Sequence, residues 1–462
     1  MDTANQWLYA TPFYIQYVQL ICYFFTVSIK HGIVYKFQKM ENIKLIITKI
    51  SLKNWYSFKD CSLDLSYPRR IVDSTVPFEY LENFENIRFK RVIILSGANA
   101  TGKTSFAKIL VAIRNFISKG ELSKFFYQGF RENDDVLEFE VEFIDRNPDP
   151  ETIDCSKVED SEKVYDFYHR LKVIVSRDNN DPEHLKLTYN FCYKAIEIKK
   201  IDSVETLRGL LDEMPFKQHK ARQTFFIDTI NDKPNQKDYL EKVFKFQSLN
   251  LTNHWNFLYN DHNDDVLLNN KASLTKDTLE AVLKTFDPSI LSVQEAHQDG
   301  KQNDNGFFAN FYNGNQIYIS NDGQVLQNKH FFSLGTYESI KIANFVSLVL
   351  STKNKRGCTF FLDEGMSYVQ SEIERNIVNL ILQKMNRYSQ FFYTTHNYDV
   401  LDMNLPIHSY LFIRKDDSFD SKFIRAEQFF KKNDRSIVNY IKNDVLGTLP
   451  DTRLLDDLLM GD

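Results

Sequence analysis

Residues 96–105, SGANATGKTS, constrain the fold of this chain more than any other stretch, because they match the pattern G-x-x-x-x-G-K-[ST]. They follow the apolar run 92–95 and precede a helical pattern at 104–118. In such a loop two glycines let successive backbone N–H groups surround a phosphate, and the helix start adds its positive dipole. The lysine reaches the β- and γ-phosphates, and the next hydroxyl can bind Mg²⁺. The expected nucleotide contacts are Gly97, Asn99, Ala100, Thr101, Gly102, Lys103, Thr104 and Ser105.

A short apolar strand that ends in two acids is predicted at residues 359–364, TFFLDE. Downstream of a phosphate loop, this pattern has the form of a Walker B strand. Asp363 is then expected to hold the Mg²⁺ shell, and Glu364 to polarise the attacking water as a general base. Two acids after an apolar run also occur at ordinary helix caps, so this prediction depends on the loop that precedes it.

A second buried strand, residues 390–397 (QFFYTTHN), ends at His396. A histidine at the end of a strand beside Walker B can donate a hydrogen bond to the γ-phosphate or to the attacking water. The prediction is therefore that His396 senses the γ-phosphate.

The segment 333–336, Ser-Leu-Gly-Thr, opens a long amphipathic helical pattern that continues to residue 351. Serine, glycine and a helix N-terminus together form an anion site. The alternative is an ordinary N-cap, with Glu338 in the first turn. The expected signature contacts are Ser333, Gly335 and Thr336.

The composition is that of an ordinary globular protein, with 43% apolar and 26% charged residues in a chain of 462. This length suits two or three domains, or one large ATPase-sized unit with insertions. A net charge of −5 excludes a global attraction to nucleic acid but leaves a local basic patch open. The five cysteines are scattered and show no zinc-ligand spacing, which is typical of reduced thiols in an intracellular protein.

The first 39 residues allow three interpretations. Residues 3–29 lack charged side chains, but glutamines interrupt the apolar run, and positive charges follow it instead of preceding it as in a secretory signal. The favoured interpretation is an ancillary or mis-annotated leader before a functional start at Met40. A packed helix and a membrane anchor are the alternatives.

The motif order resembles that of the ABC-fold, AAA-labelled ATPases related to the OLD and SMC-type proteins. The resemblance covers residues 42–415 and is strongest in the segments ITKISLKNWYSFKD, LSGANATGKTS, LTKDTLEAVLKTFDPSI, SLGTYESIKIANFV, TFFLDEG and FFYTTHN. In ABC-type ATPases the signature helix of one subunit closes over the γ-phosphate held by another. The resemblance also implies a glutamine-loop metal ligand after the P-loop helix, for which Gln128 in FFYQGF is the best-placed residue.

The resemblance implies ATP and Mg²⁺ as cofactors, a homodimer or higher homo-oligomer, and a separately encoded effector, often a nuclease. Many such proteins are ATPase components of bacterial anti-phage systems, such as Septu, PARIS and retron-associated modules. The implied function is a cytoplasmic ATPase, without membrane attachment, that regulates an effector in response to a phage protein or DNA. Two alternatives stay open: an SMC-like DNA-repair ATPase that loads on DNA, and a scaffold that uses ATP only to lock an oligomer.

The expected fold class is α/β, a P-loop NTPase of the ABC-ATPase type. It combines a mixed sheet, an antiparallel β lobe and a helical insertion between the phosphate loop and the signature. Alternating apolar patterns between residues 45 and 198 predict the antiparallel strands. The expected units are a leader (1–41), lobe I (42–199), a mainly helical insertion (200–295) and lobe II (296–462).

Overall fold

A computed structural model describes most of the chain beyond residue 44. The described residues are 45–68, 74–131, 134–146, 166–177, 186–214, 222–231, 236–249, 256–260, 274–296, 306–321, 323–325, 333–352, 357–366, 369–430, 436–450 and 452–460. All of them belong to the compact unit Asn42–Asp462, so the predictions for the leader lie outside the described residues. Among the described helices, none has the length and apolar character needed to cross a membrane.

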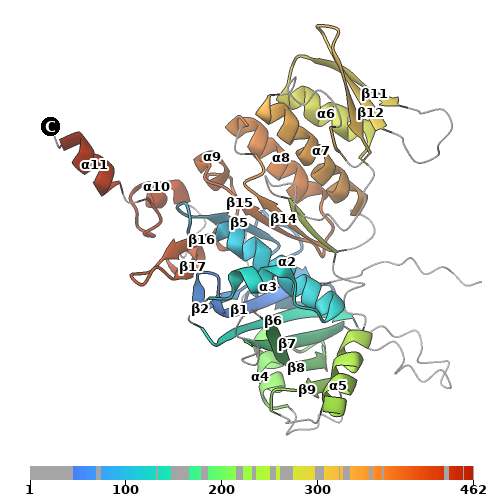
Figure 1. Cartoon of the computed structure of the whole chain (residues 1–462), viewed down its shortest axis with the longest axis vertical. Helices are drawn as coiled ribbons and strands as arrows, with labels where there is room; N and C mark the ends of the chain where they lie inside the picture. Colours follow the sequence, from blue (N-terminus) through green and yellow to red (C-terminus); the bar gives the residue numbers. More distant parts are fainter. Residues whose placement is uncertain are drawn as a thin grey trace, which may run out of the picture. The chain divides into compact units, whose positions relative to one another are not determined.

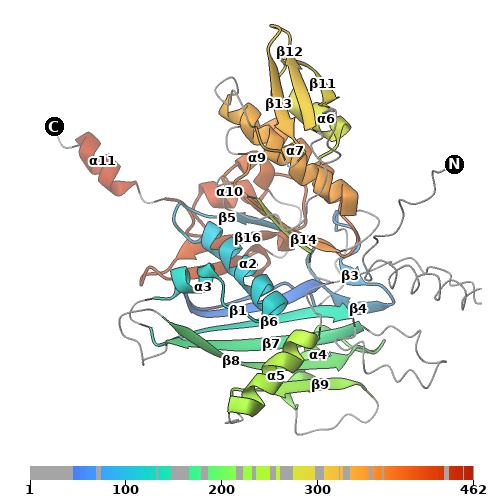
Figure 2. The ribbon, with the colours of Figure 1, turned by 45° about the vertical axis from the view of Figure 1, so that its right-hand side comes forward.

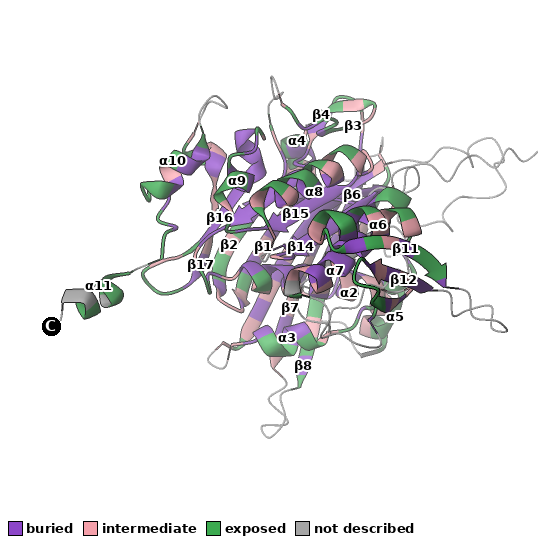
Figure 3. Ribbon diagram, turned by 90° about the horizontal axis from the view of Figure 1, so that it is seen from above, coloured by how far each residue is buried: buried purple, intermediate pink, exposed green. Residues whose placement is uncertain are grey.

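The central sheet is mostly parallel and carries the predicted phosphate loop at one strand end. Its order is β10-β14-β15-β5-β16-β17, and only β17 runs antiparallel to its neighbour. The strands are β5 (Val92–Ser96), β10 (Asn256–Asn260), β14 (Cys358–Asp363), β15 (Gln390–Thr394), β16 (Tyr410–Lys415) and β17 (Ser421–Arg425). Every residue of β5, β14 and β15 is buried, as expected for a parallel sheet covered on both faces (Figure 3).

Helices cover both faces of this sheet, because successive side chains of a strand point to opposite sides. Phe361 packs with Phe106 of α2 (Lys103–Lys119) on one face. Its neighbour Phe360 packs with Phe345 of α7 (Leu334–Thr352) on the other, where α8 (Ser371–Lys384) also lies. The long apolar patterns of these helices therefore form two separate cores.

A second, fully antiparallel sheet forms the predicted β lobe, in the order β2-β1-β6-β7-β8-β9. Helix α2 lies between it and the central sheet (Figures 1 and 2). The strands are β1 (Ile46–Trp55), β2 (Phe58–Asp64), β6 (Val136–Arg146), β7 (Asp166–Arg177), β8 (Leu187–Glu197) and β9 (Thr224–Asp228). The mixed α/β architecture with an antiparallel lobe thus agrees with the sequence prediction.

The segment predicted as mainly helical, 200–295, also contains strands. Besides α4 (Val204–Asp212), α5 (Gln236–Ser248) and α6 (Lys276–Phe286), it includes β9, β10 and β11 (Ile290–Ala296). Strand β9 extends the antiparallel sheet, and β10 extends the central sheet beside β14. Both are five-residue edge strands, and pairing with a distant neighbour stabilises them more than their local pattern predicts.

The remaining described elements complete the two lobes. In the central sheet, β16 is an interior strand between β5 and β17, and β17 is the edge strand. The further elements are β3 (Tyr80–Leu81), β4 (Phe84–Arg88), α3 (Lys124–Gly129), β12 (Gly306–Phe311), β13 (Gln316–Ser320), α9 (Tyr398–Leu401), α10 (Ile437–Lys442) and α11 (Arg453–Met460).

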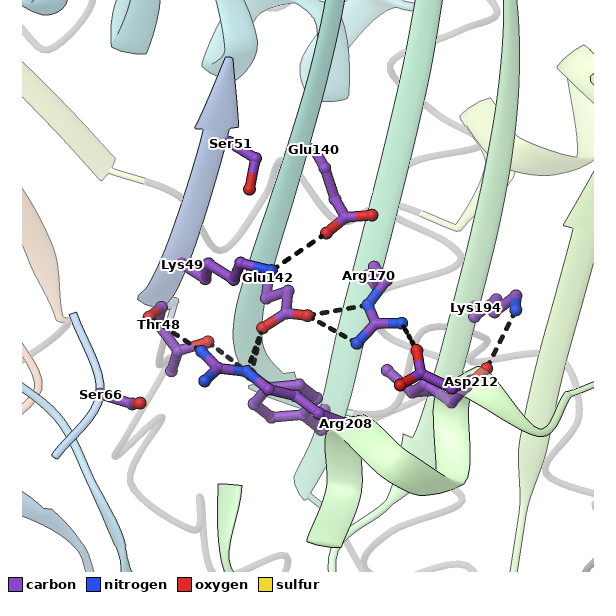
Figure 4. A network of polar contacts seen from close by, with 12 residues as sticks. Thr48, Lys49, Ser51, Ser66, Glu140, Glu142, Arg170, Lys194, Arg208 and Asp212 are labelled. Carbon is purple, nitrogen blue, oxygen red and sulfur yellow. Dashed lines mark hydrogen bonds and ion pairs between the residues drawn. The ribbon is translucent and has the colours of Figure 1, made fainter. Parts of the chain in front are cut away.

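A buried carboxylate ties α4 to the antiparallel sheet (Figure 4). Glu142 on β6 has no exposed side-chain surface and accepts hydrogen bonds from Arg170, Arg208 and the Tyr168 hydroxyl. Arg208 lies on α4 and also contacts Asp64 on β2 at 3.0 Å. The network replaces the hydration that these charges lose on burial, and it fixes the helix against three strands.

Candidate nucleotide site

The backbone of the phosphate loop requires glycine at two positions. Gly97 follows β5 with φ 149°, and a Cβ there would lie 2.2 Å from the carbonyl oxygen of Ile413 on β16. Gly102 immediately precedes α2 with φ 112°. Ala100 has φ 59°, in the left-handed region that favours glycine. The loop therefore follows an unusual backbone path, with positive φ at Gly97, Ala100 and Gly102.

Lys103 lies at the first position of α2 and is only 5% exposed. Its ammonium donates hydrogen bonds to the carbonyl oxygens of Gly97 (3.1 Å) and Ala98 (3.2 Å). Burial lowers the pKa of Lys103, while the nearby Glu364 carboxylate opposes that shift. Thr104, the next residue, is exposed at the helix start.

Asp363 and Glu364 are positioned by a threonine of the neighbouring strand. Asp363 on β14 pairs with Thr394 on β15 in the parallel register. The Thr394 hydroxyl donates to Asp363 Oδ1 (2.6 Å) and accepts from the Glu364 backbone N–H (2.8 Å). Glu364 itself has φ 49°, a strained conformation for this residue type that occurs preferentially at functional sites. The turn after β14 is thus held by β15.

Glu364 is the point where the charged groups meet. Its Oε1 lies 3.5 Å from Lys103 Nζ and 3.1 Å from His396 Nε2. The hydrogen bond from His396, with the Lys103 charge, holds the pKa of Glu364 below its ordinary value despite partial burial. The carboxylate is therefore ionised at neutral pH. The structure brings together three side chains that lie far apart in sequence, namely Lys103, Glu364 and His396.

The predicted signature residues form a helix cap in their own part of the fold. Ser333 accepts a hydrogen bond from the Thr336 backbone N–H (3.0 Å), and Thr336 donates through its hydroxyl to Asp287 (2.8 Å). Ser333 is exposed, Gly335 is half-buried and Thr336 is buried. Helix α7 packs on α6 as well as on the central sheet (Figure 1). These hydrogen bonds tie the start of α7 to the segment that follows α6, and the role of Ser333, Gly335 and Thr336 toward a nucleotide stays a prediction.

Gln128 is exposed on α3, next to the hairpin of β1 and β2. The neighbouring Gly129 carbonyl accepts a hydrogen bond from the Tyr56 N–H at 2.8 Å. The metal-ligand role of Gln128 also stays a prediction.

Several residues that position the candidate site are not singled out by any motif in the sequence. In the sequence, Thr394 is visible only as part of the strand that ends at His396. Ser421 on β17 donates to the Thr101 carbonyl of the phosphate loop and contacts the Ser57 hydroxyl at 2.6 Å. Asp287, in the segment TFDPSI, contacts the signature threonine. The two adjacent threonines before His396 are the sequence feature from which a role of Thr394 could have been predicted. Ser421 has no such feature, because only the pairing of β17 in the sheet places it beside the loop.

Comparisons with known proteins give no family assignment. No family model matches the sequence, and a search of curated proteins finds no match. The similar solved structures include an SMC head bound to the C-winged helix domain of ScpA. That match is 14% identical, covers 83% of this chain and 100% of the other, and has a TM-score of 0.38. A likeness this distant carries no argument about function, which therefore rests on the site itself.

Proposed function

We propose that this protein is a Mg²⁺-dependent ATPase whose complete sites form between two copies of the chain. The observation that carries the proposal is the meeting of Lys103, Glu364 and His396 beside the phosphate loop. These residues follow β5, β14 and β15 at the carboxyl ends of three adjacent parallel strands. Ligands of open α/β sheets bind at this edge.

Each of the three side chains has a chemical role in this proposal. Glu364 is ionised, as a general base must be, and orients the water that attacks the γ-phosphate. Lys103 supplies positive charge to the β- and γ-phosphates. His396 donates its Nε2 hydrogen to the Glu364 carboxylate and so orients the general base toward the attacking water. The loop N–H groups and the start of α2 stabilise the negative charge that develops on the phosphate oxygens.

The residues present fit Mg²⁺ bound together with a nucleotide. In the described part of the chain, no three His, Cys, Asp or Glu side chains cluster into a self-sufficient metal site. Mg²⁺ commonly takes one or two protein oxygens and completes its shell with phosphate oxygens and water. Asp363 and the Thr104 hydroxyl are the proposed ligands, and the metal would supply charge neutralisation.

The signature segment supports the assignment of a composite site. Ser333 caps the start of α7, a 19-residue helix whose N-terminal N–H groups suit an anion. In the proposal, Ser333 and Gly335 of one copy contact the γ-phosphate bound to Lys103 of another, and the buried Thr336 holds this helix start in place. ATP then acts as a bridge that shifts the population toward the dimer, and hydrolysis releases it.

A complementation experiment tests this arrangement. Lys103→Ala removes the phosphate-binding charge, and Ser333→Arg blocks the signature face, so each variant alone is expected to lack ATP hydrolysis. In an equimolar mixture, a mixed dimer combines the intact Lys103 of one chain with the intact Ser333 of the other. About a quarter of the wild-type rate should return if dimers exchange at random, because half are mixed and each has one site.

The matched control is a mixture of Lys103→Ala with the double variant Lys103→Ala/Ser333→Arg. Each of its dimers lacks the lysine at both sites, so no activity should return. Equal rates in the two mixtures would contradict the composite site. Activity in Ser333→Arg alone would show that the signature is not used.

The role of the ATPase is proposed from the family resemblance. The protein would hold or release a separately encoded effector, often a nuclease, in anti-phage defence. Co-purification with the product of a neighbouring gene, changed by ATP, tests this proposal. The SMC-like alternative predicts instead that duplex DNA stimulates hydrolysis and that moderate salt removes the stimulation.

A further inference from the structure

The loop that carries His396 is held by a buried carboxylate on α8. Glu374 is only 4% exposed. Its Oε1 accepts hydrogen bonds from the Tyr393 phenol and from the Thr395 hydroxyl (2.8 Å), and its Oε2 accepts from Asn397 Nδ2 (2.6 Å). One side chain therefore binds the residues immediately before and after His396.

Two further contacts determine which way the Asn397 amide faces. Its Oδ1 accepts from the Asp399 N–H at 2.9 Å and caps α9, so its NH₂ group points to Glu374. The Asn397 N–H donates to the Thr395 hydroxyl oxygen at 3.0 Å. Turning the amide over would lose the helix cap, so Asn397 must act as the donor to Glu374.

The loop is also tied to the phosphate-loop strand. The Thr395 N–H donates to the carbonyl oxygen of Leu95 on β5 at 3.0 Å. Burial and the Glu374 carboxylate raise the pKa of Tyr393 well above its ordinary value, so the phenol stays neutral and donates. The backbone around His396 is consequently fixed between β5 and α8.

We propose that Glu374 is the positioning residue for His396. It sets the backbone from which His396 Nε2 reaches Glu364 Oε1 at 3.1 Å. Helix α8 is the helix that follows the Walker B strand, so the same segment of chain supports both partners of this contact. The inference rests on the proposed ATPase function, in which His396 and Glu364 are the reacting pair.

Two substitutions reverse the polarity of the Glu374–Asn397 contact without changing its size. Glu374→Gln still accepts from Tyr393 and Thr395, but it places an amide NH₂ against the Asn397 NH₂. Asn397→Asp still caps α9, but it places two carboxylates together. The double variant Glu374→Gln/Asn397→Asp restores one donor facing one acceptor. It therefore separates the polarity of the contact from the presence of either residue.

The first measurement is steady-state ATP hydrolysis. Each single variant is expected to lower kcat by about tenfold or more while KM changes by less than about threefold, because the reacting groups are displaced. The double variant should return to within about threefold of the wild type. Glu372→Gln, on the exposed side of the same helix, is the matched control and should leave kcat unchanged. Wild-type kcat in both single variants, or a double variant no faster than the slower single one, would overturn the inference.

The second measurement does not require hydrolysis. Diethylpyrocarbonate modifies free imidazole nitrogens, and mass spectrometry of the digested protein follows the rate at His396. The rate should rise in both single variants as His396 Nε2 leaves Glu364, and should return in the double variant. Equal rates in all four proteins would overturn the inference. If the wild type hydrolyses no ATP but the rates follow this pattern, the proposed function fails and the positioning role stands.

Discussion

Glu364→Gln is expected to lower the rate of ATP hydrolysis by at least about a hundredfold, because an amide cannot accept a proton from the attacking water. The substitution keeps the size of the side chain and one oxygen facing His396 and Lys103. ATP binding should therefore be retained, and the ATP-bound dimer should accumulate since the step that releases it is blocked. The measurements are phosphate release and the mass of the protein in solution with Mg²⁺ and ATP.

Glu372→Gln is the matched control for Glu364→Gln, because it removes an exposed acid nearby in the chain and should change neither quantity. Hydrolysis at the wild-type rate in Glu364→Gln would reject this residue as the general base. If neither the wild type nor the variant hydrolyses ATP yet both assemble with it, the protein is a scaffold locked by ATP. Comparison of the wild type with Glu364→Gln thus distinguishes a hydrolysing ATPase from a scaffold locked by ATP.

Glu142→Ala is expected to lower the free energy of unfolding by about 3–5 kcal/mol, because it leaves two buried or half-buried guanidinium groups without their shared carboxylate. Arg170 Nε and Arg208 Nε lie 2.8 and 2.6 Å from Glu142, and the Tyr168 hydroxyl donates to it at 2.8 Å. The loss should appear as a urea unfolding midpoint of the variant that is lower than that of the wild type. The phosphate loop lies outside this network, so ATP binding by the protein that remains folded should be unaffected.

The control for Glu142→Ala lies two positions earlier on the same strand and the same face. Glu140 pairs with Lys49 at 3.6 Å, and both side chains are partly exposed. Such an ion pair contributes about 0–1 kcal/mol, so Glu140→Ala should barely move the midpoint. Equal midpoints for the two variants would show that the Glu142 network does not stabilise the fold.

The local secondary structure around the candidate site could be predicted from the sequence. The loop at 96–105 lies between a buried strand and α2, and TFFLDE forms the end of β14. Both patterns are local, since they depend on glycine conformations and on apolar runs within a few residues. The same reasoning placed the antiparallel lobe, because half-buried strands alternate in sequence.

Local sequence patterns do not predict two of the strands. Strands β9 and β10 lie in a segment whose helices dominate the sequence signal, and each is a short strand paired with a distant neighbour. A short strand gains its stability from the partner, so its own residues predict it poorly.

The sequence alone determined which chemical groups the candidate site has, because the glycine loop with its lysine, the paired acids and the terminal histidine are each encoded within a few residues. Tertiary structure alone decided which groups meet. Pairing of β15 between β14 and β5 brings Thr394 to Asp363 and His396 to Glu364. The packing of α8 brings Glu374 beneath the same loop. The physical reason is that contacts between residues distant in sequence depend on strand order and register, which only the packed sheet defines.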